Sequence, residues 1–117
     1  MALEDDLFGL EKGFWLSGSE HFLEHVDTEA LLAFPQAGEM HGVFGREQIA
    51  ATAASSNRWR DLAMSNRQLL SIGDVAIISY KADVVRADGE PYIALVSSAY
   101  VRRHTGWMLA FHQHSPL

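Results

Sequence analysis

Long strand-like segments dominate the second half of the chain, and they constrain the fold more than any other feature. The segments "DVAIISYKADVV" and "YIALVSSAYVRR" are rich in β-branched residues, which favour strands. Between them, "ADGEP" places Asp-Gly at a hairpin turn, and "HTG" then leads into "WMLAFHQHS". An earlier strand is predicted within "DLAMSNRQLLSIG". The pattern predicts a meander of at least three long antiparallel strands.

The first half of the chain has the pattern of helices instead. Apolar residues recur at the three- and four-residue spacing of an amphipathic helix, at Leu3, Leu7, Leu10 and Phe14. A short second helix is predicted from Ser19, a short strand at 29–35, and a third, alanine-rich helix from Gly45. Helices followed by a run of long strands are expected of an α+β domain with its helices packed on one face of an antiparallel sheet.

Composition argues against several classes of protein. The chain has 117 residues, 48 % of them hydrophobic and 21 % charged, which predicts one globular domain over residues 1–117. A net charge of −6 argues against nucleic-acid binding, because that function depends on clustered Lys and Arg. No apolar run approaches the roughly 20 residues of a spanning helix, so no membrane partner is expected. The acidic start "MALEDDLFGL" lacks the positive charge of a signal peptide and predicts a cytoplasmic protein.

Cysteine is absent, which removes disulfides, thiolate catalysis and thiolate metal sites together. In "HFLEH", His21 and His25 are four residues apart on one helical face, a spacing that can hold a metal. The segment lacks the metalloprotease signature, because Glu does not follow the first His, and no third ligand is evident. Glu20 and Glu24 fit a solvated helix face. Neither a metal site nor a cofactor is expected.

Two histidines close the last predicted strand, in "GWMLAFHQHSPL", and they are the candidate catalytic residues. Strand alternation places on one side Met108, Ala110, His112 and His114, and on the other Trp107, Leu109, Phe111 and Gln113. Both sides are largely apolar, which predicts that both are covered, one of them by a second copy of the chain. A β-bulge would reverse the assignment.

Histidine is the side chain best suited to move a proton near neutral pH. Two histidines at the mouth of a pocket would bind an anion or act as acid and base. The alternative reading is that His112 and His114 are hydrogen-bonded residues at the rim of the sheet, with no role in a ligand site.

The order of these elements resembles the nuclear transport factor 2-like superfamily, and most closely its SnoaL-like and kinase-association-like branches, which include bacterial domains of unknown function. The most specific segments are "FPQAGEMHGVFGREQI" and "GWMLAFHQHSP", and the resemblance covers nearly the whole chain. It implies a cone, in which a strongly curved antiparallel sheet wraps around the long N-terminal helix and leaves a pocket between them. It also implies a homodimer, commonly formed through the outer face of the sheet.

The kinase-association domains place a basic residue just before their terminal serine, pointing into the pocket. His114 occupies the matching place, so the side that carries His112 and His114 is expected to face inward. Trp59 is expected to cover the opening, and Tyr80 offers an apolar body with a polar tip. Simple core packing is the alternative reading for the aromatic residues. The expected ligand-pocket residues are Phe14, Trp15, Phe34, Trp59, Tyr80, His112 and His114.

Enzymes of this superfamily offer two mechanisms for comparison. The steroid isomerases hold their general base immediately before the proline that matches the one in "AFP", where this chain has Phe34. The acid that stabilises their dienolate lies where this chain has the serines of "SSA", so that mechanism is not expected. Cyclases and dehydratases use a His with an Asp or Glu, which leaves open a pairing of His112 or His114 with Glu11 or Asp27.

Three functions remain as hypotheses. The one we favour is a small-molecule-binding domain with a mostly apolar pocket, with a cyclase-, dehydratase- or isomerase-type reaction as an option. The second is a non-catalytic oligomerisation module, and the third is an adaptor that binds peptides. The expected partners are an unidentified small molecule and a second copy of the chain, and the sequence names no substrate.

Overall fold

The structure, a computed structural model, describes residues 3–34, 41–52, 59–86 and 88–117. Its helices are α1 (Leu3–Leu16), α2 (Ser19–His25) and α3 (Arg46–Thr52). Its strands are β1 (Val26–Ala33), β2 (His41–Gly45), β3 (Trp59–Ile72), β4 (Val75–Arg86), β5 (Pro91–Arg103) and β6 (Gly106–Pro116). None of the helices in these ranges is long and apolar enough to cross a membrane.

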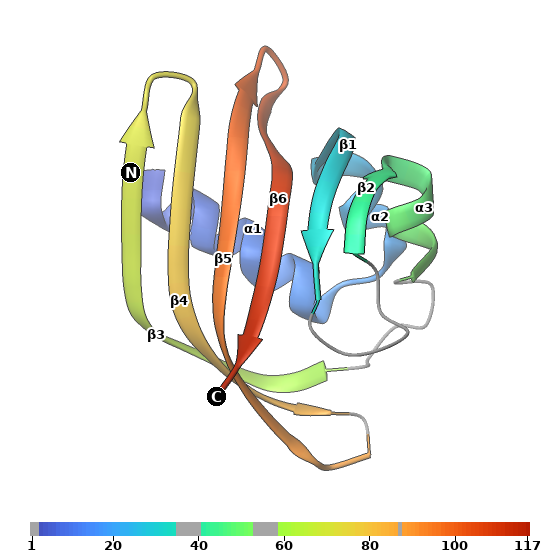
Figure 1. Cartoon of the computed structure of the whole chain (residues 1–117), viewed down its shortest axis with the longest axis vertical. Coiled ribbons are helices and arrows are strands. Elements are labelled where there is room, and N and C mark those ends of the chain that lie inside the picture. Colours follow the sequence, from blue (N-terminus) through green and yellow to red (C-terminus); the bar gives the residue numbers. More distant parts are fainter. Residues whose placement is uncertain (1–2, 35–40, 53–58, 87) are drawn as a thin grey trace.

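The strands form one curved sheet in the order β2-β1-β6-β5-β4-β3 (Figure 1). Strands β3 to β6 form the predicted meander, each antiparallel to the next. β1 runs parallel to β6, so the sheet is mixed and not antiparallel throughout as expected. No hairpin joins these two strands, because most of the chain lies between them, and their relative direction is therefore not set by a turn. The sequence patterns did not predict β2, and Pro35, expected to close β1, lies outside the described residues.

Strand β3 is irregular near its beginning. Its register with β4 slips twice, and the slips contain Asp61 and Asn66, whose φ angles are 55° and 52°. Bulges of this kind increase the local twist and bend the strand, and Asp and Asn tolerate positive φ better than most residues. The bend is visible at the lower end of the sheet in Figure 1. It brings Trp59 against Trp15 of α1, with ring centroids 5.0 Å apart.

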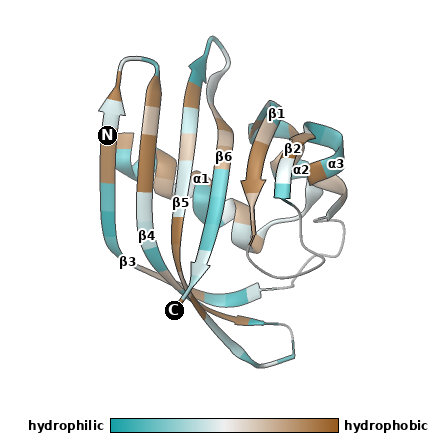
Figure 2. Cartoon of the chain, viewed as in Figure 1, coloured by the Kyte–Doolittle hydropathy of each residue, from teal (hydrophilic) through white to brown (hydrophobic). Residues whose placement is uncertain are grey.

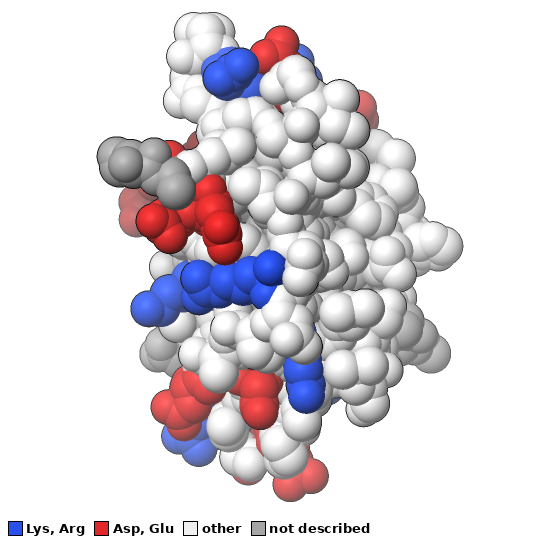
Figure 3. Space-filling view, turned by 90° about the vertical axis from the view of Figure 1, so that its left-hand side faces the viewer, with Lys and Arg blue, Asp and Glu red and all other residues white. Residues whose placement is uncertain are grey.

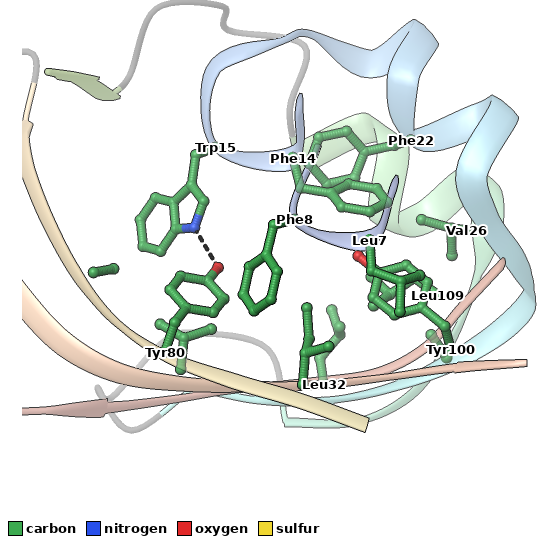
Figure 4. Close-up of a cluster of buried hydrophobic side chains, with 14 of the residues drawn as sticks. Leu7, Phe8, Phe14, Trp15, Phe22, Val26, Leu32, Tyr80, Tyr100 and Leu109 are labelled. Carbon is green, nitrogen blue, oxygen red and sulfur yellow. Dashed lines mark hydrogen bonds between the residues drawn. The ribbon is translucent and has the colours of Figure 1, made fainter. Parts of the chain in front are cut away.

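The core lies between α1 and the inner face of the sheet. In β4, alternate residues are buried, namely Ala76, Ile78, Tyr80, Ala82 and Val84. α1 contributes Leu7, Phe8, Phe14 and Trp15 to the same cluster (Figure 4). Figure 2 shows that hydrophobic and hydrophilic stretches follow each other along the long strands. Burial of a side chain the size of Leu or Phe contributes about 1.5–3 kcal/mol, and this packing holds α1 on the sheet.

The opposite side of the sheet, here called the outer face, exposes apolar side chains. Ile77 and Leu95 are 39 % and 45 % exposed, because they alternate with buried residues of β4 and β5. The exposed large apolar residues of the outer face are Leu31, Val43, Leu70, Ile72, Ile77, Ile93 and Leu95. In the side view of Figure 3, charged side chains gather toward the helix side, and the right-hand part, where the sheet lies, is almost free of them.

Candidate functional site

A cavity of about 70 Å³ lies between the helices and the inner face of the sheet. Side chains from all three helices and from β1, β3 and β6 form its walls, together with Phe34 just after β1. The described residues that line it are Phe14, Trp15, Phe22, Leu32, Phe34, Ile49, Trp59, Leu109, His112 and His114. Their polar side-chain atoms are the imidazole nitrogens of the two histidines and the indole nitrogens of Trp15 and Trp59. Trp15 Nε1 already donates to the Tyr80 hydroxyl.

A β-bulge in β6 determines which of its residues reach this cavity. Tyr100 of β5 pairs with Leu109, whereas the preceding Ala99 pairs with Phe111, so Ala110 is an extra residue. The bulge places Leu109 on the same side as His112, although the two are three residues apart. Strict alternation had put Leu109 on the opposite side, and this part of the prediction was wrong. His112 and His114 follow the bulge and both face the cavity.

The two imidazoles are in direct contact. Their Nε2 atoms lie 2.9 Å apart, so one nitrogen donates a hydrogen bond to the other. His112 Nδ1 lies 2.7 Å from Ser98 Oγ, and His114 Nδ1 lies 3.2 Å from Tyr92 Oη. The His114 ring also stacks on Trp15, with centroids 4.9 Å apart and an interplanar angle of 11°. These contacts hold both rings in defined orientations.

The hydrogen bonds form one chain from Ser98 through His112 and His114 to Tyr92. If His112 carries its proton on Nδ1, its Nε2 accepts from His114, whose Nδ1 then accepts from the Tyr92 hydroxyl. If His112 carries its proton on Nε2, His114 carries its own on Nδ1 and donates it to Tyr92. Two neutral tautomeric arrangements therefore satisfy the same geometry.

A buried carboxylate lies behind the histidine pair. Glu11 of α1 is 0 % exposed, and its Oε1 lies 3.7 Å from His112 Nδ1. The Tyr80 hydroxyl donates to Oε1 at 2.6 Å, and the Tyr100 hydroxyl donates to Oε2. Trp15 Nε1 donates in turn to the Tyr80 hydroxyl at 2.8 Å (Figure 4). Both oxygens of Glu11 therefore have a tyrosine hydroxyl as hydrogen-bond partner.

Burial controls the ionisation of these groups. It lowers the pKa of His112, and the Glu11 carboxylate opposes this effect. Burial, followed by repulsion from His112, lowers the pKa of His114 to about 2. Burial and then the charge of Glu11 raise the pKa values of Tyr80 and Tyr100 well above the usual range. At neutral pH the imidazoles are uncharged and both tyrosines keep their protons.

No protein-family model matches the sequence, and a search of curated proteins also found no match. Solved structures do match. A ketosteroid isomerase candidate from Parabacteroides distasonis has 15 % identity and a TM-score of 0.79, covering 99 % of this chain and 89 % of its own. An NTF2-like protein from Cytophaga hutchinsonii has 14 % identity and a TM-score of 0.79, with 100 % of both chains covered. The CaMKII hub of S. rosetta has 16 % identity and a TM-score of 0.72, covering 97 % and 92 %.

The chain has the nuclear transport factor 2-like fold. The fold expected from the sequence is thereby confirmed. At these identities the similarity extends to the fold alone, so the chemistry of the site has to be argued from the residues of this chain.

Most of the predicted pocket residues lie around the cavity of this nuclear transport factor 2-like fold, namely Phe14, Trp15, Phe34, Trp59, His112 and His114. Tyr80 differs, because it is fully buried and is not among the residues that line the cavity. Its hydroxyl lies between Glu11 and Trp15 behind the wall. The physical reason is that the polar tip of Tyr80 finds its hydrogen-bond partners on α1. The part that these residues play in binding a ligand stays a prediction.

The structure also separates the two carboxylates considered as partners of the histidines. Glu11 is the one beneath His112, at 3.7 Å. Asp27 instead accepts two hydrogen bonds from Arg103, at 3.1 and 2.7 Å, which lower the pKa of its carboxyl group. Glu11 follows Leu7 by four residues and precedes Trp15 by four. A lone acid on the apolar face of an amphipathic helix is the signal that would have distinguished it.

Several lining residues were not predicted as pocket residues, namely Phe22, Leu32, Ile49 and Leu109. Phe22 lies in the short helix predicted from Ser19, and Leu32 lies in the short strand predicted at 29–35. Nothing in a single sequence distinguishes a wall residue from a core residue of the same type, because both are buried and apolar.

His21, one of the two histidines of α2, is held by contacts with α1. His21 Nε2 lies 3.0 Å from the backbone carbonyl of Leu10, and its ring packs edge-on against Phe14. Burial lowers the pKa of His21. Across the parts of the chain that the structure describes, no group of three or more His, Cys, Asp or Glu residues could hold a metal ion.

Proposed function

We propose that the protein binds a small, largely apolar molecule in the cavity, and that His112 and His114 provide its polar contacts. The observation that carries the proposal is a pair of uncharged imidazoles facing a cavity whose other described walls are aromatic or aliphatic. Ligand sites commonly combine such walls with a few converging polar groups, which fix the orientation of the ligand.

The size of the cavity limits the ligand. Its volume of about 70 Å³ is smaller than the roughly 150 Å³ of an engineered cavity that binds benzene. A short branched chain is therefore the largest group that its closed part accommodates without movement of the walls, and a single ring requires some movement of the walls. A longer molecule would extend past Trp59, whose ring is in contact with Trp15 and Tyr92.

The isomerase described among the structural neighbours does not supply a mechanism for this chain. Phe34, at the position expected for a general base, has no proton-accepting atom, and its ring meets the edges of the His112 and His114 rings. The proposed function is therefore binding. Any proton transfer to a bound molecule would involve the two imidazoles, which are the titratable groups of the described cavity wall.

Thermal denaturation with a panel of single-ring amides, alcohols and carboxylates tests this proposal. A ligand at one hundred times its Kd stabilises the folded state by about 2.7 kcal/mol, which is seen as a rise in Tm. In His114→Phe the ring stack on Trp15 is retained and the polar contact is lost. We therefore expect the apparent affinity, obtained from the rise of Tm with ligand concentration, to fall at least tenfold. His104→Phe, at an exposed position, is the matched control and should respond like the unmodified protein.

If no compound raises the Tm, or if His114→Phe and His104→Phe respond equally, the histidine pair is a structural feature and the proposal is wrong. Isothermal titration calorimetry with the best compound gives the same comparison without heating the protein. It also separates loss of affinity from loss of stability.

A specific observation favours a second role, self-association through the outer face. That face combines Leu70, Ile77 and Leu95 with the other apolar residues named above, and it spans strands from both halves of the sheet. Contiguous exposed apolar surface commonly marks a protein interface. Among the structural neighbours are a CaMKII hub and an association domain. The partner proposed is a second copy of this chain, related by a two-fold axis, because such an axis places the same apolar side chains of both copies against each other. Lys81 and Asp83, on the same side of β4, are of opposite charge. The molecular mass in solution tests this role.

A further inference from the structure

The charges around the cavity are unevenly distributed. Among the described residues that line it there is no Lys, Arg, Asp or Glu. Behind the wall, the Glu11 carboxylate lies 3.7 Å from His112 Nδ1. Two tyrosine hydroxyls donate hydrogen bonds to this carboxylate. Both tyrosines keep their protons, because burial and Glu11 itself raise their pKa values. An acidic side chain therefore lies behind the histidine part of the cavity wall.

Other titratable groups on the surrounding elements do not cancel the charge of this acidic side chain. α2 contributes His21, which is bound to the Leu10 carbonyl and has a lowered pKa. β4 contributes Arg86, whose guanidinium lies 5.1 Å and 4.8 Å from the ring centroids of Trp59 and Tyr92. Arg86 does not line the cavity and is partly exposed, so solvent screens it. The described wall residues from α3, β1 and β3 are apolar.

This distribution has a consequence for a ligand that carries a negative charge. An anion placed against the histidine pair would lie near Glu11, within the Debye length of about 8 Å, with low-dielectric protein between them. It would find two neutral imidazoles in place of a cation. A proton added to the imidazole pair would change this, because the imidazolium would then lie between Glu11 on one side and the anion on the other.

We propose that the cavity selects its ligand by charge: it takes an uncharged polar group, and it takes an acid only together with one proton. Glu11 is the residue that sets this selectivity, acting through His112, and it does not touch the ligand. The inference rests on the proposed ligand site and names its ligand class. The proton resides either on the acid itself or on the imidazole pair, and in both cases one proton enters with each acid.

Benzamide and benzoate test the proposal, because they have nearly the same shape and differ in charge. Binding of each is measured by isothermal titration calorimetry between pH 6 and 8. We expect the Kd for benzamide to be unchanged over this range. For benzoate we expect it to rise about tenfold per pH unit, because one proton is taken up. Titrations in two buffers of different ionisation enthalpy should give an uptake of about one proton per benzoate and none per benzamide.

Glu11→Gln removes the charge and keeps the size of the side chain. In this variant we expect the Kd ratio of benzoate to benzamide at pH 8 to fall at least tenfold and the pH dependence to flatten. If the variant does not fold, the buffer titrations on the unmodified protein decide the matter alone. Equal binding of both compounds at pH 8 with no proton uptake would overturn the charge selectivity while leaving the ligand site intact. Binding of neither compound at millimolar concentration would overturn the ligand site itself.

Discussion

Gly13 lies beneath the imidazole of His21, and this contact joins α1 to α2. A Cβ atom built on Gly13 would lie 2.2 Å from Cε1 and 2.4 Å from Nε2 of that ring. The ring cannot move away freely, because Nε2 is bound to the Leu10 carbonyl and the ring packs against Phe14. Gly9, on the same helix, has no atom within 4 Å of the equivalent point. The two glycines of α1 therefore have opposite roles.

We predict that Gly13→Ala destabilises the protein by about 1 kcal/mol or more, although alanine favours helices. Gly9→Ala should stabilise it by up to about 1 kcal/mol, because only the helix propensity changes there. Urea unfolding curves give both free energies. A Gly13→Ala variant as stable as Gly9→Ala would show that the imidazole moves aside at no cost. In the double variant with His21→Ala the penalty specific to Gly13 should disappear.

His114 makes the stability of the fold depend on pH. Its pKa is lowered from 6.5 to about 2, so between these values the unfolded chain binds a proton that the folded chain does not. Stability is then fully present above pH 6.5 and falls as the pH decreases, by about 1.4 kcal/mol per pH unit. The lowered pKa values of His112 and His21 act in the same direction. The lowered pKa of Asp27 acts only below its usual value of 3.8.

We therefore predict that the free energy of unfolding of the unmodified protein falls between pH 7 and pH 5, and that His114→Phe reduces this fall by about 2 kcal/mol. Urea denaturation at a series of pH values measures both slopes. His104→Phe is again the control and should keep the slope of the unmodified protein. An unchanged slope in His114→Phe would mean that this imidazole already binds its proton near pH 6.5 in the folded state.

At the scale of elements, Glu11 connects α1 to two strands of the sheet. Its carboxylate accepts from Tyr80 of β4 and from Tyr100 of β5, and Tyr80 also accepts from Trp15 one turn further along α1. Hydrogen bonds to a charged group contribute about 1.5–3 kcal/mol each, and a buried donor left without a partner costs a further 1–3 kcal/mol or so. This network fixes the position of the helix over the sheet.

We predict that Tyr100→Phe destabilises the fold by about 1.5–3 kcal/mol, through loss of one bond to the carboxylate. Tyr80→Phe should cost more, because it also leaves the indole nitrogen of Trp15 without its acceptor. Urea denaturation of the two variants ranks them. If Tyr80→Phe is no more damaging than Tyr100→Phe, the Trp15 hydrogen bond contributes nothing net to stability. A double-mutant cycle with Glu11→Gln then measures how much of each loss passes through the carboxylate.

The sequence predicted the long strands and the inward histidines, but it did not predict how the elements meet. Hairpin turns and alternation are local signals, and they indicated the β3 to β6 meander correctly. The extra residue Ala110 has no local signal, so the side to which Leu109 points was predicted wrongly. The parallel pairing of β1 with β6 is likewise a long-range contact. Glu11 was an open alternative because its partner lies about one hundred residues away along the chain.

At the scale of the whole molecule, the fold could be predicted because helix and strand patterns follow each other in a characteristic order. The cavity could be predicted only as a consequence of that fold. Its contents depend on side chains from separate elements, such as Phe22, Ile49 and Trp59, which meet only when the sheet curves. Apolar residues on the outer face were predicted from the sequence of β6, which has apolar residues on both of its sides. The core covers only one side of a sheet, so the other side needs a different cover.

We predict that two copies of the chain associate through the outer face, with a mass in solution of twice 13.0 kDa. The paired substitutions Ile77→Lys and Leu95→Lys place charges in the middle of that face, at positions 39 % and 45 % exposed. Analytical ultracentrifugation should then give the mass of a single chain. Because both side chains point away from the core, the circular dichroism spectrum should not change.

Leu23→Lys is the matched control, because Leu23 is 42 % exposed but lies on α2, away from the outer face. It should leave the mass at that of two copies. If the unmodified protein sediments as a single chain at concentrations of tens of micromolar, the outer face is not a self-association surface. If the paired lysine variant still sediments as two copies, a different surface joins them. Because the cavity lies on the other side of the sheet, the single-chain variant should still bind benzamide, and this separates the two proposed roles experimentally.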